Sequence, residues 1–323
     1  MFDVVCVGNA TIDAFICMKG RVRERHLMLP VGSKKEVQSI FYSTGGGATN
    51  TAVGFSRLGL RAGVLAAIGN DAAGGIVIRE LRKEGIGTGL VSSLQNYSTA
   101  YSAILTGFGA DRIILVYGGA TTHLGEERHI RWSLLSQTRW MHVSSFHAEP
   151  RILHKVLEFG KARHIGISFN PGKSEIALGM KRIAPMLRLV DVLLLNREEA
   201  GILTKEKSLK GQMRKLQVLA PIVVVTEGRK GSNAFDGSFF YHKPSYNVKI
   251  ADTTGAGDAF HSGFVAAIIR GKPIERALDE GNANAESVIM HLGAKNKLLT
   301  QGELERFIAQ HETSRTKVEK ETA

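Results

Sequence analysis

The chain has 323 residues, of which 43% are hydrophobic and 22% are charged, a composition typical of a folded globular protein with a large core. Its formal net charge of +12 favours anionic ligands such as nucleotides, but the basic residues are spread out, so no nucleic-acid partner is expected. Two cysteines exclude a disulfide framework and favour the cytoplasm, and no run of about 18 apolar residues is present that would indicate a membrane partner.

Short, continuous apolar runs alternate with amphipathic stretches along most of the chain. Continuous hydrophobicity predicts strands that are buried on both faces, as in a parallel sheet. Amphipathic stretches such as 74–84 and 151–163 predict helices between these strands. The alternation therefore predicts a doubly wound α/β domain. The predicted strands are 3–7, 64–68, 140–144, 165–170, 191–195 and 222–226.

Two segments, 15–44 and 98–118, depart from this alternation. Both mix polar and apolar residues without a long helical period, and the second contains candidate strands at 99–106 and 112–116 around residues 107–111. We expect both segments to leave the α/β core and form a small second β layer. The charged end, 311–323, is expected to be a solvated or frayed tail.

The first predicted strand is followed by an acidic residue. The segment 8–13 reads Gly-Asn-Ala-Thr-Ile-Asp, so Asp13 lies just past the carboxyl end of that strand. Open α/β sheets bind ligands at this edge, where a carboxylate can accept hydrogen bonds from paired sugar hydroxyls. An Asx turn is an equal alternative.

Three consecutive glycines at 45–47 precede a helical pattern that carries Asn50. Without side chains, the backbone at Gly46 and Gly47 can lie against a ligand, and the Asn50 amide offers both donors and an acceptor. A flexible turn before a helix is the alternative interpretation.

Two further segments each follow a predicted strand. Asn196 with Glu199 three residues later predicts a helix-capping box, and the same pair can organise a hydrated Mg²⁺. Thr226 ends the next apolar run, and Gly228 and Gly231 follow it. These residues can line the phosphate or ribose of a nucleotide, or form a plain β-turn.

The most specific pattern is 252–258, Asp-Thr-Thr-Gly-Ala-Gly-Asp, followed by apolar residues at helical spacing. Gly255, Ala256 and Gly257 let backbone N–H groups approach an anion, and the helix N-terminus adds partial positive charge. The Asp258 carboxylate can take a proton from a hydroxyl as it attacks a phosphate. The alternative is a tight turn with Asp258 as the helix cap.

In this order, the segments resemble the ribokinase-like carbohydrate kinases, also called the PfkB family. Residues 45–50 look like the N-terminal signature of the family, and 252–258 like its C-terminal signature. The resemblance implies a three-layer α/β/α core with a mainly parallel sheet and a small β-sheet lid over the substrate. The predicted division is a kinase core of 1–14, 45–97 and 119–310, a lid of 15–44 and 98–118, and a charged tail of 311–323.

The resemblance also assigns roles to individual residues. Catalysis falls to Asp258 as the base, with an anion hole of Gly255, Ala256 and Gly257. Substrate binding falls to Asp13, Gly46, Gly47 and Asn50. ATP binding falls to Asn196, Thr226, Gly228, Gly231 and Asn282. Metal binding falls to Glu199, which would hold Mg²⁺ through water, and to Asp252 and Thr254, which match a monovalent-cation (K⁺) site.

Departures from ribokinase itself bear on the substrate. Thr11 stands where ribokinase has Asn, Gly47 stands where it has Lys, and a ribose-binding glutamate is replaced near Ser144 or Ser145. The predicted pocket then lacks a lysine and a second acid, which disfavours ribose and phosphorylated sugars.

We therefore predict an ATP-dependent kinase that phosphorylates a hydroxyl, preferably a primary one, of a nucleoside or small sugar. A ribokinase- or fructokinase-type sugar kinase and a non-catalytic ligand-binding protein on the same fold are the alternatives. A homodimer joined through the lid is also expected, because an isolated small sheet exposes its edges. Phe15, Phe41 and Tyr42 would stack on the substrate, or form the lid core or the dimer interface.

Overall fold

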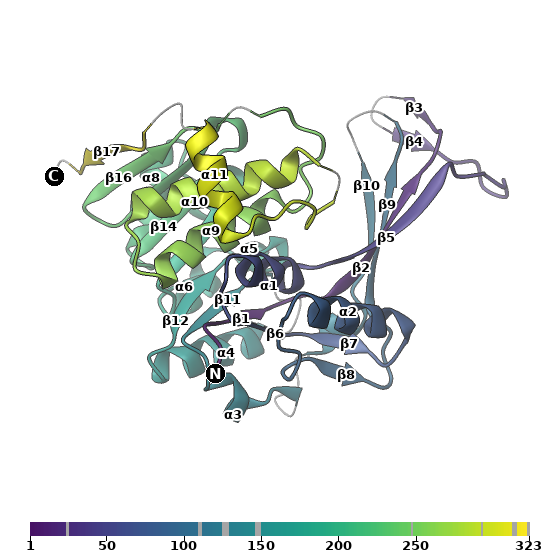
Figure 1. The fold of residues 1–323 in the computed structure, drawn as a ribbon, viewed down its shortest axis with the longest axis horizontal. Coiled ribbons are helices and arrows are strands. Elements are labelled where there is room, and N and C mark those ends of the chain that lie inside the picture. Colours follow the sequence, from purple (N-terminus) through teal and green to yellow (C-terminus); the bar gives the residue numbers. More distant parts are fainter. Residues whose placement is uncertain are drawn as a thin grey trace.

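A nine-stranded sheet forms the centre of the protein, and a smaller sheet projects from it (Figure 1). The computed structural model describes residues 1–23, 26–108, 112–124, 129–145, 150–246, 248–291, 293–311 and 315–321. The central sheet has the order β17-β16-β15-β14-β13-β12-β11-β1-β6. Six neighbouring strands are parallel: β6 (Ala62–Leu65), β1 (Val4–Val7), β11 (Trp140–Val143), β12 (Gly166–Phe169), β13 (Val192–Asn196) and β14 (Ile222–Thr226). The antiparallel strands are β15 (Ser232–Phe235), β16 (Phe239–Lys243) and β17 (Lys317–Lys320).

Side chains of β1 alternate between two hydrophobic clusters, one on each face of the sheet. Val4 and Cys6 belong to one cluster, and Val5 and Val7 belong to the other. The first cluster includes residues of α1 (Gly47–Arg57), α2 (Ala72–Lys83), α9 (Ala256–Ile269), α10 (Ile274–Ile289) and α11 (Gln301–His311). The second includes residues of α3 (Trp132–Leu135), α4 (Pro150–Ala162), α5 (Lys173–Ala177), α6 (Met180–Leu187), α7 (Arg197–Thr204) and α8 (Leu209–Gln217). These clusters produce the three-layer α/β/α arrangement that the sequence predicts.

The projecting sheet has the order β10-β9-β2-β5. Its strands are β10 (Ile113–Tyr117), β9 (Ala100–Thr106), β2 (Thr11–Cys17) and β5 (Ser39–Gly45), and β3 (Arg21–Arg23) pairs with β4 (His26–Met28). The strands of its first segment begin at Thr11 and end at Gly45, so this segment extends at both ends beyond the predicted range 15–44, into residues that were predicted to belong to the core. Residues 109–111 of the predicted loop lie outside the described residues. We call the four-strand sheet the lid sheet.

Two predicted elements differ from the structure. The apolar run 64–68 is divided, because β6 leaves β1 after Leu65 and β7 (Ala67–Gly69) pairs with β8 (Ser92–Leu94) in a separate sheet. The described part of the tail is not frayed, because β17 pairs with β16 along four residue positions. Charged side chains suit this outer edge of the sheet, where they discourage further strand pairing.

The parallel strands direct their carboxyl ends to one edge of the sheet. The segments that follow β1, β13 and β14 carry Asp13, Glu199 and Gly228, and they therefore meet at that edge. Within the described ranges, no helix combines the length and apolar character required to cross a membrane.

Candidate active site

The N-terminus of α9 lies at the centre of the site. Gly255 is the N-cap residue and has φ 78°, and a Cβ there would lie 2.5 Å from the Cα of Ala294, so only glycine fits. Asp258 lies in the first turn, beside N–H groups that have no acceptor within the helix. The alternative prediction that Asp258 caps α9 is wrong, since Gly255 occupies that position.

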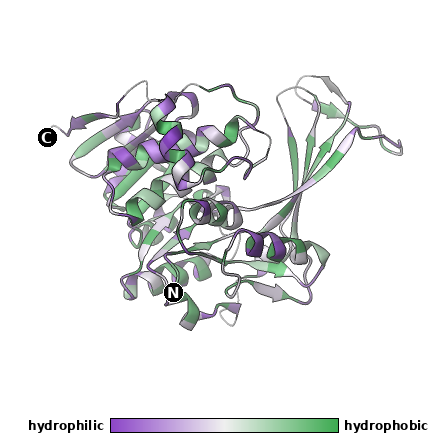
Figure 2. Ribbon diagram, viewed as in Figure 1, coloured by the Kyte–Doolittle hydropathy of each residue, from purple (hydrophilic) through white to green (hydrophobic). Residues whose placement is uncertain are grey.

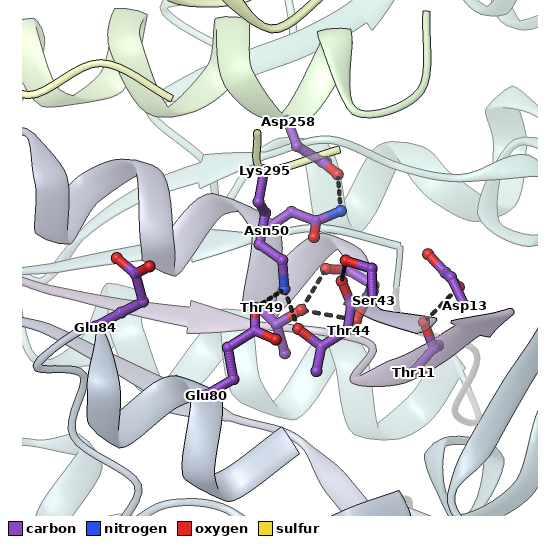
Figure 3. Close-up of polar contacts among 12 residues, drawn as sticks. Thr11, Asp13, Ser43, Thr44, Thr49, Asn50, Glu80, Glu84, Asp258 and Lys295 are labelled. Atoms are coloured by element: carbon purple, nitrogen blue, oxygen red, sulfur yellow. Dashed lines mark hydrogen bonds and ion pairs between the residues drawn. The ribbon is translucent and has the colours of Figure 1, made fainter. Parts of the chain in front are cut away.

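Asp258 instead contacts the helix that follows the glycine triplet. The Nδ2 group of Asn50, on α1, donates to Oδ2 of Asp258 over 2.8 Å, which joins two segments 208 residues apart (Figure 3). Asn50 is buried, and its Oδ1 atom has no hydrogen-bond partner among the described residues. Burial raises the pKa of Asp258 to about 6, against opposing effects of the Asn50 hydrogen bond and the positive charge of Lys295.

Asp13 lies on β2, and the backbone around it is closely packed. Thr11 Oγ1 donates to Asp13 Oδ1 over 3.1 Å, and a Cβ at Gly45 would lie 2.0 Å from Asp13 Oδ2. Burial raises the pKa of Asp13, while hydrogen bonds from Ser102 and Thr11 and the charge of Lys295 oppose this effect. Gly45 therefore leaves room for a partly buried carboxylate at the end of the lid sheet.

The two predicted substrate-binding glycines each pack against protein atoms. Gly46 has φ 96°, and a Cβ there would lie 2.3 Å from the Asn9 carbonyl oxygen. A Cβ at Gly47 would lie 2.5 Å from Ser144 Oγ, and Asp258 Oδ1 would be 3.7 Å away. Close packing against protein atoms therefore accounts for glycine at both positions, whether or not a ligand binds there.

Lys295 is a functional candidate that the sequence analysis missed. It is only 7% exposed, and Nζ donates to Thr44 Oγ1 and pairs with Glu80 Oε1 at 2.6 Å (Figure 3). Its positive charge opposes the rise that burial causes in the pKa values of Asp13 and Asp258. The expectation that no lysine adjoins these residues is therefore corrected, although the charge of Lys295 is balanced by Glu80. Lys295 follows a glycine–alanine pair and belongs to no periodic pattern. The neighbouring sequence therefore contains no signal that would identify it as a site residue.

A cavity of about 360 Å³ adjoins the N-terminus of α9. It brings together six predicted site residues: Thr226, Gly228, Gly231, Ala256, Gly257 and Asn282. The sequence analysis missed the rest of its lining, which includes Val248, Ile250, Phe260 and Ile289. A largely apolar cavity beside a helix N-terminus suits a ligand with one flat apolar part and one anionic part.

Two of the predicted nucleotide-binding residues also have structural roles. Asn282 accepts from Ser232 Oγ over 2.8 Å, and its Nδ2 donates to the carbonyl oxygens of Lys243 and Pro244. A Cβ at Gly231 would lie 2.0 Å from the Lys243 carbonyl oxygen. Gly228 differs, because a Cβ there would meet open space. Asn282 and Gly231 therefore shape the cavity wall by packing, whereas glycine at 228 is explained by its φ of 56°.

The predicted capping box at the start of α7 is confirmed. Asn196 Oδ1 accepts from the Glu199 N–H, and Glu199 Oε2 accepts from the Asn196 N–H, both over 2.9 Å. Asn196 lies opposite Thr226 in the β13–β14 register, at the edge that carries the cavity. Burial and the neighbouring Glu198 raise the pKa of Glu199. In the described part of the chain, no three His, Cys, Asp or Glu side chains cluster as a protein-only metal site would require.

At the predicted monovalent-cation site, Asp252 has an arginine partner. Its Oδ1 atom accepts from the Thr254 N–H over 3.0 Å, from Thr254 Oγ1 over 2.8 Å and from Arg112 Nη1 over 2.8 Å. Its Oδ2 atom accepts from the Gly293 N–H over 3.2 Å. Arg112, next to β10, is a contact that the sequence analysis did not predict.

The arrangement therefore combines three chemical elements. Asp258 is a carboxylate whose pKa of about 6 suits proton transfer near neutral pH. The Ala256 N–H donates to the Thr253 carbonyl oxygen over 3.3 Å, so the anion beside Asp258 is left with the N–H groups of Gly255 and Gly257 and the dipole of α9. Asn50 contacts Asp258 directly, the charge of Asp13 reaches it, and Ala256 and Gly257 of the same turn line the largely apolar cavity.

Comparisons with known proteins agree with this geometry. The family described as pfkB family carbohydrate kinase matches residues 1–301. An ATP-dependent ribose-1-phosphate kinase from Halopiger xanaduensis is 29% identical over 252 residues, which cover 76% of this chain and 80% of the relative. The ribokinase of Bacillus subtilis is 26% identical over 317 residues, which cover 96% and 100%. The crystal structure of a Methanocaldococcus jannaschii nucleoside kinase, an archaeal member of the ribokinase family, superposes with a TM-score of 0.82 at 22% identity, over 96% of this chain and 99% of that one.

Proposed function

The chain belongs to the pfkB family of carbohydrate kinases, and on that premise we propose that it transfers the γ-phosphate of ATP to a primary hydroxyl of a nucleoside or small unphosphorylated sugar. The fold and the kinase class that the sequence predicted are thereby confirmed. The observation that carries the proposal is the Asn50–Asp258 hydrogen bond. It joins the proposed substrate-binding residues, Asp13 and Asn50, to the turn 255–257, which we call the anion-binding turn.

Asp258 is the proposed general base. With a pKa of about 6 it is mainly ionised at pH 7, yet it remains basic enough to accept the proton of an attacking hydroxyl. The Asn50 amide holds one oxygen in place, which leaves the other free to face the hydroxyl. Negative charge that develops on the transferred phosphoryl group would meet the N–H groups of Gly255 and Gly257 and the α9 dipole, and the Ala256 N–H could join them only by leaving the Thr253 carbonyl oxygen.

The cavity beside α9 is the proposed ATP site. Its apolar wall suits an adenine ring, and Thr226, Gly228 and Asn196 lie at the strand ends where ribose and phosphates would follow. Glu199 is the residue that would hold Mg²⁺ through water, and its partly buried carboxylate at this edge fits that ion. Bound Mg²⁺ would neutralise phosphate charge.

The substrate side favours vicinal hydroxyls. The unpartnered Oδ1 atom of Asn50 can accept a hydrogen bond, and the Asp13 carboxylate can accept two. Because Lys295 is paired with Glu80, its charge is already balanced, which supports an unphosphorylated substrate. Phe15 is buried and stacks on Phe41 at 4.4 Å, which favours a role in the lid core over substrate contact.

The lid sheet is also the proposed dimer interface. Its outer strand β10 exposes the apolar side chains of Ile114, Leu115, Val116 and Tyr117, and Figure 2 shows hydrophobic residues along the sheet. Exposed apolar edge strands usually pair with or pack against a partner. The free thiols of Cys6 and Cys17 support the proposed cytoplasmic location.

A phosphorylation screen tests this proposal. Adenosine, guanosine, inosine, cytidine, ribose, fructose and fructose 6-phosphate would each be incubated with ATP and Mg²⁺, and kcat/KM measured. Asp258→Asn should bind ATP normally but lose about 10²–10⁴-fold in kcat, the usual contribution of a general base. A clear preference for fructose 6-phosphate would contradict the unphosphorylated substrate, and near wild-type turnover by Asp258→Asn would contradict the base assignment.

A sugar kinase of the ribokinase or fructokinase type is the second candidate, and the same screen separates it from a nucleoside kinase. A non-catalytic ligand-binding protein would bind nucleotide without turning over any substrate in the screen.

A further inference from the structure

An ion pair joins the lid side of the protein to the loop before α9. Arg112 immediately precedes β10, and Asp252 lies 140 residues later. Arg112 Nη1 and Asp252 Oδ1 are 2.8 Å apart, and their side chains are 30% and 10% exposed. An ion pair at this depth is screened less by salt than an ordinary surface pair.

The Asp252 carboxylate accepts hydrogen bonds from four protein donors. Three of them, including the Arg112 guanidinium, approach Oδ1, and one approaches Oδ2. The Arg112 guanidinium is therefore already a cationic partner of the Asp252 carboxylate, so the K⁺ site implied by the family resemblance does not fit this chain.

We propose that the Arg112 guanidinium takes the place of a monovalent cation at Asp252, so that Arg112 positions the anion-binding turn and catalysis does not depend on K⁺. The proposal rests on the kinase function proposed above. Arg112 is a positioning residue, because it acts through Asp252 and not on the substrate.

The other contacts of Asp252 explain how Arg112 can affect the position of the anion-binding turn. Asp252 holds Thr254 by two hydrogen bonds, and Thr254 directly precedes Gly255, the N-cap of α9. Asp252 also holds Gly293, and the neighbouring Ala294 packs against Gly255. Without a cation, the carboxylate would lose a donor, and its uncompensated negative charge would oppose charge development on the phosphoryl group nearby.

The test compares three variants of the full-length protein. Arg112→Gln removes the charge, Arg112→Lys keeps it, and Arg61→Gln is the control. Arg61 pairs with Asp3 at 3.0 Å next to β6, at the amino ends of the parallel strands and thus away from the site. Each protein is assayed for kcat and KM in KCl, NaCl and N-methylglucamine chloride at a constant ionic strength of about 0.1 M. The melting temperature without substrate is measured in the same salts.

For the wild type, Arg112→Lys and Arg61→Gln, neither kcat nor the melting temperature of each protein should change from one salt to another. Arg112→Gln should lose about tenfold in kcat in N-methylglucamine chloride, because a partly buried charge is left without its partner, and KCl should restore most of the loss. KCl should also raise its melting temperature relative to N-methylglucamine chloride.

Two results would overturn the inference: wild-type activity that requires K⁺, or Arg112→Gln activity and melting that are indifferent to K⁺. A protein with no turnover in any salt would instead contradict the kinase proposal, and the melting temperatures would still decide the role of Arg112.

Discussion

Two buried histidines, His142 on β11 and His261 on α9, should make the protein sensitive to acid. The rings of His142 and His261 have centroids 5.9 Å apart, and His142 Nδ1 lies 2.8 Å from Ser168 Oγ. Burial lowers the pKa of His261 to about 3, and burial together with the neighbouring His261 lowers that of His142 well below 6.5. Both side chains are therefore neutral in the folded protein, whereas in the unfolded chain they titrate near pH 6.5.

The sign of the effect follows from proton binding. Below pH 6.5 the unfolded chain binds protons that the folded protein excludes, so the free energy of unfolding falls as the pH falls. Well below pH 6.5 each histidine costs about 1.4 kcal/mol per pH unit, and both together cost about 4 kcal/mol between pH 7 and 5. Asp258 acts in the opposite direction, because its folded pKa of about 6 lies above its ordinary 3.8. It offsets about 1.4 kcal/mol between pH 7 and 5, so these three groups together lower the free energy of unfolding by about 3 kcal/mol.

Urea denaturation at pH 7, 6.5, 6, 5.5 and 5 measures this loss. The double variant His142→Gln/His261→Gln carries neutral amides of similar size, so it should lose about 4 kcal/mol less than wild type over this pH interval. The control His154→Gln replaces a partly exposed histidine on α4 and should follow the wild-type curve. A double variant with the wild-type pH dependence would refute the reasoning.

Three further predictions concern activity and stability. The logarithm of kcat/KM should fall with unit slope below a pKa of about 6, since protonated Asp258 cannot act as a base. Lys295→Met should move this pKa upward, because it removes a nearby positive charge. An unshifted pH–rate profile in that variant would contradict the role given to Lys295. Gly255→Ala should lower stability by about 1–3 kcal/mol and reduce kcat, because φ 78° and contact with Ala294 exclude a Cβ; wild-type melting and turnover would contradict it. Deletion of 315–323 should lower the melting temperature, because it removes β17 from the edge of the sheet. The KM for ATP should not change. An unchanged melting temperature would show that this strand does not stabilise the fold.

Local patterns predicted most of the core. Continuous apolar runs identified the six parallel strands because these strands are buried on both faces. The capping box at Asn196 was predictable because both of its partners lie within one helical turn. The described tail was predicted wrongly, since a short charged segment carries no sign that an edge strand is available to pair with it.

The sequence by itself determined the α/β class, the kinase family and the two glycine-rich segments, because these depend on periodicity and on backbone that tolerates no side chain. Only the tertiary structure decided which charges meet. Asn50 and Asp258 are 208 residues apart, and Arg112 and Asp252 are 140 apart, so no local pattern relates them. Lys295 likewise finds Glu80 only after the chain has folded. Such pairs determine the charge state of the site because burial makes the pKa of each group depend on partners that distant segments supply.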